Sequence, residues 1–317
     1  PVVLPADPTL TVLNSNSRER ELDGYVSLTS RWSPDLQSFA GVRLSRISRS
    51  SEISDGSEPV SFEQTVSTPW AGVAWSASDS TTFYASWGQG VELEAVSNRP
   101  ALFANAGQVL PALKSEQTEI GLKWQANSRL LLTAAAFSID KPYADDLPGA
   151  AAGALPTRVA GAKTARHRGL ELSAAGRVLD ALSLQASLMA LDARYTQAAD
   201  PTLVGQRVTN LPHVKASVFA DYKVSALPGL SVSALASLQG AKAANADGSV
   251  ELPASWQIDA GLSYAHSIAG QSVLWRANLE NLTDRTYWRE APTTAWGGIY
   301  LFPSTPRTLR VSAALSF

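Results

Sequence analysis

The segment RTLRVSAALSF, from Arg307 to Phe317, decides the fold because its residues alternate strictly in character. The apolar positions are Leu309, Val311, Ala313, Leu315 and Phe317, and those between them are Thr308, Arg310, Ser312, Ala314 and Ser316. A period of two is typical of a β-strand with one apolar and one polar face. The segment therefore predicts a strand that separates an apolar from a polar environment.

The same alternation recurs along most of the chain. Its clearest example is 213–224, where Val214 and Val218 share one face and Lys215 and Asp221 the other. Strands are expected at 18–32, from 39, from 68, 81–87, 116–124, 130–140, 169–178, 182–191, 213–224, 230–239, 256–264, 273–281 and 307–317. Their connections alternate between short turns and long loops, the long ones including 48–63, 88–113 and 141–165. This asymmetry is typical of outer-membrane β-barrels, which also place aromatic residues at the boundary between lipid and water.

Composition narrows the classes of protein that fit. Charged residues make up 17% and the formal net charge is −2, which gives no basic surface to attract nucleic acid. No apolar run reaches the ~18 residues of a transmembrane helix. With no cysteine, the chain has neither disulfides nor thiolate metal sites. The sequence predicts an all-β fold, an antiparallel transmembrane β-barrel.

The strand count bears on domain organisation. About 13 to 14 strands are expected, each long enough to cross a bilayer if roughly 9–11 residues suffice. An odd number cannot close by antiparallel pairing alone, and an open edge is not tolerated in lipid. Either Leu10–Leu13 adds an edge strand or residues 1–317 are the C-terminal portion of a larger barrel. The chain opens PVVLPAD, without the basic start of a signal peptide, so we expect a processed protein or a fragment.

Six motifs, in order, resemble segments of the TonB-dependent siderophore receptors, the closing motif being in two parts, at Leu279 and at Thr305. They are TFYASWGQG from Thr82, EQTEIGLKW from Glu116, AAFSIDK from Ala135, RGLELS from Arg168, NLPH from Asn210, LENLTDRTY from Leu279 and TPRT from Thr305. The resemblance runs from about Arg18 to Phe317. It implies a barrel of about 22 strands with a plugged lumen, of which this chain covers roughly the last 13. The plug, the early strands and the contact with TonB that the plug carries are expected to be missing.

The long loops are the expected ligand surface. A ferric siderophore already satisfies its metal, so its site needs aromatic walls and cations rather than protein ligands to the metal. The predicted binding residues are Tyr84, Arg99, Phe103, Trp288, Arg289, Trp296, Tyr300 and Phe302. The alternative is a membrane-interface belt, which is the preferred interpretation for Trp87, Trp124, Trp256 and Trp275.

No catalytic constellation, cofactor site or metal site is expected. His167, His213 and His266 are scattered, without metal-ligand spacing. The carboxylates Glu119, Glu171 and Asp221 are expected to face the lumen. There they are predicted to form salt bridges with Lys123, Lys215 and Lys223 rather than to perform acid–base chemistry.

The sequence thus predicts an outer-membrane receptor of a Gram-negative bacterium that imports a ferric siderophore. Its expected partners are the siderophore, TonB, the lipid bilayer and lipopolysaccharide, and no nucleic acid. Cobalamin, another metal chelate or an oligosaccharide is an alternative cargo, and a passive pore or a soluble β-rich enzyme or adhesin is an alternative class. The membrane interpretation requires that Val214, Val218, Leu309 and Leu315 not be buried under a second layer of the chain.

Overall fold

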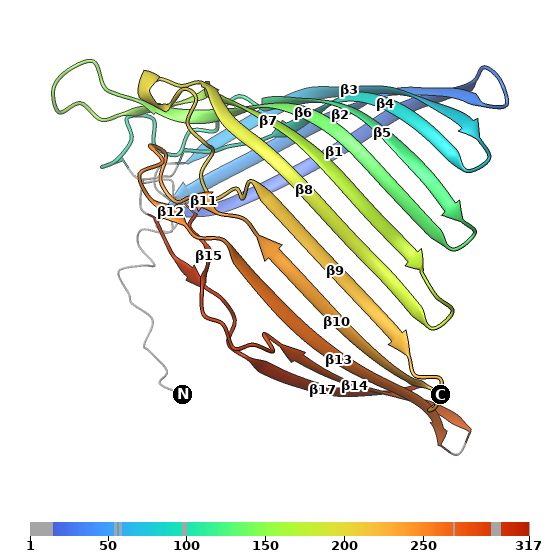
Figure 1. Cartoon of the computed structure of the whole chain (residues 1–317). Coiled ribbons are helices and arrows are strands. Elements are labelled where there is room, and N and C mark those ends of the chain that lie inside the picture. Colours follow the sequence, from blue (N-terminus) through green and yellow to red (C-terminus); the bar gives the residue numbers. More distant parts are fainter. Residues whose placement is uncertain are drawn as a thin grey trace.

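Thirteen strands follow one another in chain order in one antiparallel sheet (Figure 1). The structure is a computed structural model and describes residues 15–53, 56, 59–96, 100–268, 270–292 and 299–316. The sheet strands are β1 Ser15–Arg31, β2 Leu36–Ile53, β3 Val60–Ser78, β4 Thr81–Glu92, β5 Leu113–Asn127, β6 Leu130–Leu147, β7 Thr157–Arg177, β8 Leu182–Gln197, β9 Val214–Lys223, β10 Leu230–Gln239, β13 Ser255–Ile268, β14 Gln271–Glu280 and β17 Thr308–Ser316. Two small hairpins complete the fold, β11 Lys242–Ala243 with β12 Glu251–Leu252, and β15 Trp288–Glu290 with β16 Phe302–Pro303. A 3-10 turn, η1 Pro201–Leu203, lies between β8 and β9.

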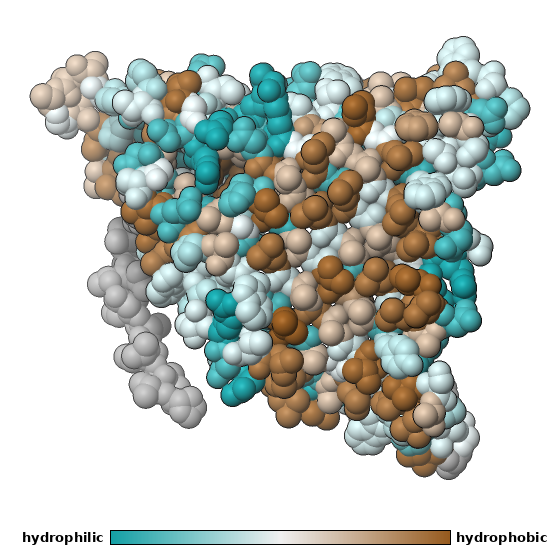
Figure 2. Space-filling model, in the orientation of Figure 1, coloured by the Kyte–Doolittle hydropathy of each residue, from teal (hydrophilic) through white to brown (hydrophobic). Residues whose placement is uncertain are grey.

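The sheet is curled, and its two faces differ in character. In Figure 1, β1 passes behind β8, and in the same orientation Figure 2 shows hydrophobic side chains gathered on the convex side. Val218 is 44% exposed there, Leu309 65% and Leu315 49%, and Val214 is half-buried. Since paired residues share a face, the register places these side chains on the convex side from one strand to the next. The predicted alternation is confirmed, and none of the four is covered by a second layer.

The connections alternate in length, as predicted. Those at one end of the sheet, here called the turn end, span 32–35, 79–80, 128–129, 178–181, 224–229 and 269–270. Those at the other end, the loop end, span 54–59, 93–112, 148–156, 198–213, 240–254 and 281–307. None of the described residues forms a helix long and apolar enough to cross a membrane.

Several strands extend farther toward the loop end than the sequence predicted. The expected loop 48–63 is mostly strand, because β2 continues to Ile53 and β3 begins at Val60. The expected loop 141–165 shrinks to 148–156, since β6 and β7 pair beyond Lys141. These extensions are rich in polar and small residues, so their sequence does not show the alternation of apolar and polar residues that indicates a strand. With these extensions, β2, β3, β6 and β7 are longer than the roughly 9–11 residues that suffice to cross a bilayer.

Aromatic rings on the concave face cover glycines of the neighbouring strand. A Cβ added at Gly121 would lie 2.3 Å from the ring of Tyr84, and one at Gly169 would lie 2.4 Å from the ring of Phe137. Trp70 covers Gly41 in the same way. Only glycine lets a ring lie flat on the strand at these positions, so the motifs around Tyr84, Gly121 and Gly169 meet in space.

The predicted salt-bridge ladder is wrong. Among the described residues, Glu119 instead accepts hydrogen bonds from Tyr84 Oη at 2.7 Å and from Gln117 Nε2 at 3.1 Å. Lys123 lies with Nζ 5.5 Å from the centroid of the Tyr84 ring. The ring of Tyr84 covers Gly121, which lies between Glu119 and Lys123 on β5. The ring therefore lies between the Glu119 carboxylate and the Lys123 ammonium. The proposed extra strand Leu10–Leu13 and the C-terminal Phe317 lie outside the described residues.

Candidate ligand-binding site

The loop end is a layer with small hydrophobic cores of its own. One core contains Val96, Phe103, Leu110 and Ala144, and another contains Ala165, Ala193, Tyr195 and Val208. A third joins Ala244, Leu252 and Ala291. Each core unites residues from segments distant in sequence. The loops are thus held in place by burial, and the surface that they present to a ligand is preorganised.

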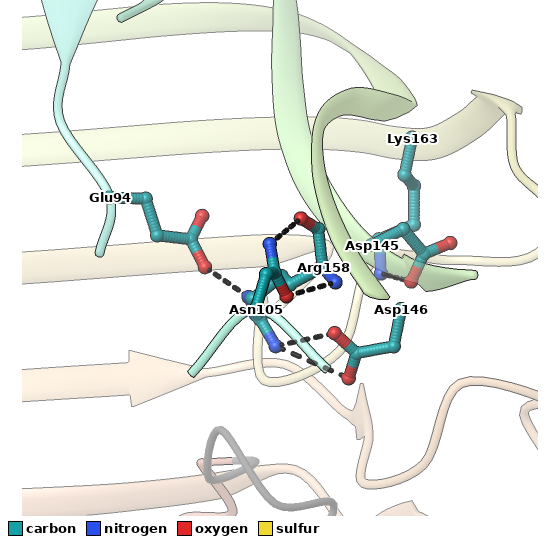
Figure 3. Close-up of polar contacts among 6 residues, drawn as sticks. All are labelled: Glu94, Asn105, Asp145, Asp146, Arg158 and Lys163. Atoms are coloured by element: carbon teal, nitrogen blue, oxygen red, sulfur yellow. Dashed lines mark hydrogen bonds and ion pairs between the residues drawn. The ribbon is translucent and has the colours of Figure 1, made fainter. Parts of the chain in front are cut away.

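Arg158, at the start of β7, ties loop 93–112 to the β6–β7 hairpin (Figure 3). Its Nε donates to Glu94 Oε1 at 2.7 Å, and its Nη1 donates to Asp146 Oδ1 at 3.0 Å. Its main chain is also held, because Asn105 accepts from its N–H at 3.0 Å and donates to its carbonyl at 2.9 Å. The Arg158 side chain is only 16% exposed. Beside this network, Lys163 pairs with Asp145 at 3.1 Å.

Two tyrosines and two lysines form a wall on the concave face just below the loops. The rings of Tyr143 and Tyr195 meet edge to face, with centroids 6.5 Å apart. Lys141 Nζ lies 5.3 Å from the Tyr143 ring, and Lys163 Nζ lies 5.5 Å from the Tyr195 ring. Tyr143 Oη and His167 Nε2 are 3.2 Å apart. Such a combination of aromatic faces and cations suits a bulky anionic chelate.

The β15–β16 hairpin gathers four of the predicted binding residues. Trp288 pairs with Pro303 and Glu290 with Phe302, which places Arg289 between them on β15. The side chains of Trp288, Tyr300 and Phe302 are about half exposed, at 48%, 52% and 45%. The hairpin therefore presents an open aromatic surface at the loop end, as a stacking site for an aromatic or conjugated ligand requires.

Buried contacts fix this hairpin to the neighbouring loops. Lys242 is 5% exposed, and its Nζ donates to the carbonyl of Arg289. Burial lowers the pKa of Lys242, an effect that the nearby Glu290 carboxylate partly offsets. The side chain of Asn210 accepts from the N–H of Ala291 at 2.9 Å, and Ala291 is fully buried.

Asn281 sets the point where the chain leaves β14 for this hairpin. It is fully buried and adopts a φ of 51°. Its Nδ2 donates to the carbonyls of Arg285 at 2.8 Å and Thr305 at 3.0 Å, and its Oδ1 accepts from the N–H of Arg285 at 2.9 Å. One side chain thus joins both ends of connection 281–307, which explains an asparagine at this place in the motif.

The other predicted binding residues lie elsewhere. Tyr84 lies on the concave wall in β4, where it hydrogen-bonds to Glu119. Phe103 is 4% exposed and forms part of the hydrophobic core of loop 93–112. Its ring therefore stabilises the loop and does not form part of the surface that a ligand can reach. Arg99 and Trp296 lie outside the described residues. The structure therefore unites the residues of connection 281–307 and leaves Tyr84 and Phe103 apart from them.

The loop end carries several groups suited to contacting a ligand. The described residues contain no group of three or more His, Asp or Glu side chains placed to hold a metal ion. The carboxylates of Glu94, Asp145 and Asp146 are engaged in ion pairs. What the surface offers a ligand is aromatic faces, amide groups and cations.

Sequence reasoning missed Arg158, Lys242 and Asn210 as organising residues. Arg158 is 64 positions from Glu94, Lys242 is 47 from Arg289, and Asn210 is 81 from Ala291. No local periodicity connects such pairs. Only Asn210 carried a signal, because it begins one of the motifs that resemble a known family.

A family model described as "TonB dependent receptor-like, beta-barrel" matches residues 2–282. The ferrichrome receptor FcuA of Yersinia enterocolitica is 30% identical over 214 residues, which cover 67% of this chain and 27% of that protein. The chain therefore spans about a quarter of the length of this relative.

Solved structures share the fold. The ferric preacinetobactin receptor BauA of Acinetobacter baumannii superposes with a TM-score of 0.78 at 24% identity, over 96% of this chain and 44% of that one. The ferric yersiniabactin uptake receptor FyuA of Yersinia pestis gives a TM-score of 0.74 at 17% identity, over 96% and 46%. At these identities the likeness concerns the fold alone.

Proposed function

Because the chain belongs to the TonB-dependent receptor β-barrel family, we propose that it is part of an outer-membrane receptor that imports a ferric siderophore. The observation that carries the proposal is the 30% identity to a ferrichrome receptor. The fold shared with receptors for ferric preacinetobactin and ferric yersiniabactin supports it. The family consists of receptors and transporters, which fits the binding chemistry of the loop end.

The proposal places the convex face in the lipid of a Gram-negative outer membrane, with the loop end outside the cell. Apolar convex side chains and the asymmetry of the connections support this placement. Among the described residues, β1 and β17 each pair on one side only. Because an open strand edge in lipid leaves backbone groups unsatisfied, the proposal includes further strands that complete a barrel of about 22. It also includes a plug domain that couples to TonB.

Ligand binding is assigned to the loop end. Trp288, Tyr300 and Phe302 offer stacking faces to the organic shell of a ferric chelate, with Arg289 between them in sequence. Arg99 and Trp296, which lie outside the described residues, are also proposed to contact the ligand. Tyr84 is proposed to contact the ligand farther along the import path through the barrel. Phe103 is proposed to act indirectly, by supporting loop 93–112.

Uptake by the intact receptor tests this function. A Gram-negative host without its own siderophore receptors would express the full-length protein under iron limitation and receive radioactive iron as ferrichrome, as a catecholate or as a phenolate chelate. We expect accumulation from one of these classes, abolished when TonB is deleted. Accumulation unchanged by TonB deletion would favour a passive pore. Uptake of cobalamin or an oligosaccharide without uptake of any ferric chelate would contradict the assigned cargo.

A further inference from the structure

Lys242 of β11 is buried against the β15–β16 hairpin at the loop end, where β11 and β15 lie close together (Figure 1). It is 5% exposed, and among the described residues its Nζ has one hydrogen-bond acceptor, the carbonyl of Arg289. An ammonium carries three N–H donors, and a charge without a counter-ion is costly to bury. No described carboxylate lies within ion-pair distance of it. Lys242 therefore holds a positive charge that the described residues leave uncompensated.

Two further cations lie in the same region. Lys215 is exposed on the concave face of β9, and it pairs in register with Gln239, three residues before Lys242. The Arg289 side chain is 47% exposed on the hairpin. Burial is the main cause that lowers the pKa of Lys242, and the positive charges of Arg289 and Lys215 lower it further. Lys215, Lys242 and Arg289 therefore lie close enough to act on one another, and they are here called the cation cluster.

The carboxylates of this region do not balance the cluster. Glu290 lies 3.5 Å from Arg289 in a half-exposed pair. Glu251 of β12 already pairs with another arginine at 3.1 Å. Glu171 shares a concave row with Lys215 but lies two strands away, at roughly 10 Å. Among the described residues, three cations thus face one adjacent carboxylate.

The concave wall of tyrosines and lysines is balanced, by contrast. Lys141 pairs with Glu92 at 2.5 Å, and Lys163 pairs with Asp145 at 3.1 Å. Each lysine of the wall has a carboxylate of its own, so these pairs add no net charge. The positive excess therefore comes from the cation cluster and not from the wall.

The rings beside the cluster favour an aromatic ligand. Trp288, Tyr300 and Phe302 are half exposed in the same connection that carries Arg289. Exposed rings gain most from a partner that is itself aromatic, because two rings can stack. Excess positive charge and exposed rings are separate observations, and a ligand that is both anionic and aromatic satisfies both.

We propose that the cation cluster selects ferric tris-catecholates, which are anionic and aromatic, over ferric trihydroxamates, which are neutral. Three doubly charged catecholates outweigh the charge of ferric iron, whereas three singly charged hydroxamates cancel it. Lys215 and Arg289, whose side chains are exposed, contact the chelate, and Lys242 positions Arg289 by holding its carbonyl. The attraction is strongest where the surrounding loops exclude water. The inference rests on the proposed function and deepens it, because it names the charge class of the cargo.

Binding of two chelates to the full-length receptor in detergent tests the selection. The probes are ferrichrome, a neutral trihydroxamate, and a ferric tris-catecholate, each titrated by calorimetry at low and at high salt. The variants are Lys215→Gln and Arg289→Gln, which remove exposed charges. Lys223→Gln is the matched control, because Lys223 is exposed on the same face of β9 at the turn end. Lys242 is kept, since its loss would also release the hairpin.

We expect the unmodified receptor to bind the tris-catecholate about tenfold more tightly than ferrichrome at low salt, and less selectively at high salt, since salt screens exposed charges. Lys215→Gln and Arg289→Gln should each weaken binding of the tris-catecholate about fivefold and leave binding of ferrichrome unchanged. Lys223→Gln should leave both affinities unchanged. Tighter binding of ferrichrome, selectivity unaffected by salt, or equal losses in Lys215→Gln and Lys223→Gln would overturn the proposal.

Two further probes separate this inference from the proposed function. They are cobalamin and an acidic oligosaccharide, neither of which carries ferric iron. Binding of ferrichrome without the tris-catecholate counts against the charge selection and leaves the import of a ferric siderophore standing. Binding of the acidic oligosaccharide alone, weakened in Lys215→Gln, counts against the ferric cargo and leaves the cluster standing as an anion site. Binding of none of the four probes contradicts both.

Discussion

The sheet and the loop layer of this protein are held together in different ways. In the sheet, each strand pairs with its neighbours in sequence, and short turns join alternate pairs. In the loop layer, the contacts that matter join distant segments, such as Glu94 with Arg158 and Asn210 with Ala291. The sheet therefore follows a local rule repeated along the chain, whereas the loop layer depends on particular side chains. The effect of a substitution in the sheet should therefore depend on which face of the strand it changes. The effect of a substitution in the loop layer should depend on the contacts of the individual residue.

The largest effect is expected for a charge placed on the convex face. Val218→Arg puts a guanidinium among acyl chains and should lower the free energy of unfolding by about 2–4 kcal/mol. Ser217→Arg, one position away on the concave face, should lose only its hydrogen bond to Ser187, worth about 1 kcal/mol. Urea unfolding of the intact receptor in lipid vesicles measures both. Equal losses of unfolding free energy would mean that the convex and concave faces do not contact different environments, lipid on one side and water on the other.

Asn281→Ala is expected to act next most strongly. It leaves the carbonyls of Arg285 and Thr305 without the donor that the buried Asn281 side chain supplies, and it puts alanine at a positive φ. We expect a loss of about 2 kcal/mol. The control is Asn127→Ala, at the exposed end of β5, which removes one hydrogen bond from the N–H of Arg129. If the two variants unfold alike, a buried asparagine at the loop end has no special structural role.

Arg158→Ala should detach loop 93–112. The change leaves Glu94 and Asp146 without their cation and should cost about 1–2 kcal/mol locally. Its counterpart at the turn end is Arg129→Ala, whose partner Asp180 is 91% exposed, and little change is expected there. Limited proteolysis read by mass spectrometry should find faster cleavage within 93–112 in the first variant only. Unchanged cleavage would show that the hydrophobic core around Phe103 holds the loop without Arg158.

Trp288→Ala should leave stability unchanged and weaken ligand binding. Loss of a half-exposed stacking face should reduce affinity for the transported chelate by about tenfold, or ~1.4 kcal/mol. Trp124→Ala, on the convex face, removes the same side chain without touching the loop end. Titration calorimetry with the chelate identified by uptake compares the two. Equal affinities would move the binding surface away from the β15–β16 hairpin.

The sequence predicted the sheet well because a period of two needs no knowledge of distant residues. Positions 214–223 carry it almost without interruption, and the observed strand is β9 Val214–Lys223. It predicted the loop-end extensions of the strands poorly. Residues 157–165 of β7, for example, are mostly small or polar, so they do not show the alternation with apolar residues that indicates a strand. The salt-bridge ladder at Glu119 failed because the ring of Tyr84 occupies the space between carboxylate and lysine.

The candidate site was only partly accessible to the same reasoning. Aromatic residues in a long connection indicated Trp288, Tyr300 and Phe302, which the structure leaves half exposed. The same composition also indicated Phe103, which is buried. Composition does not distinguish a ring that faces a ligand from one that supports a loop. The difference lies in the packing of Val96 and Leu110 against Phe103, which no local pattern encodes.

The most direct test of the account is a solvent-accessibility scan of 214–223 in the membrane-bound receptor. The chain contains no cysteine, so single cysteines carrying spin labels report without interference, and collisions with oxygen and with a water-soluble nickel complex measure contact with lipid and with water. We predict that even positions, with Val218 among them, meet oxygen, and that odd positions, with Ser217 among them, are reached better by the nickel complex. Accessibility without a period of two, or with even positions shielded from both reagents, would contradict the assignment of one face to lipid and the other to water.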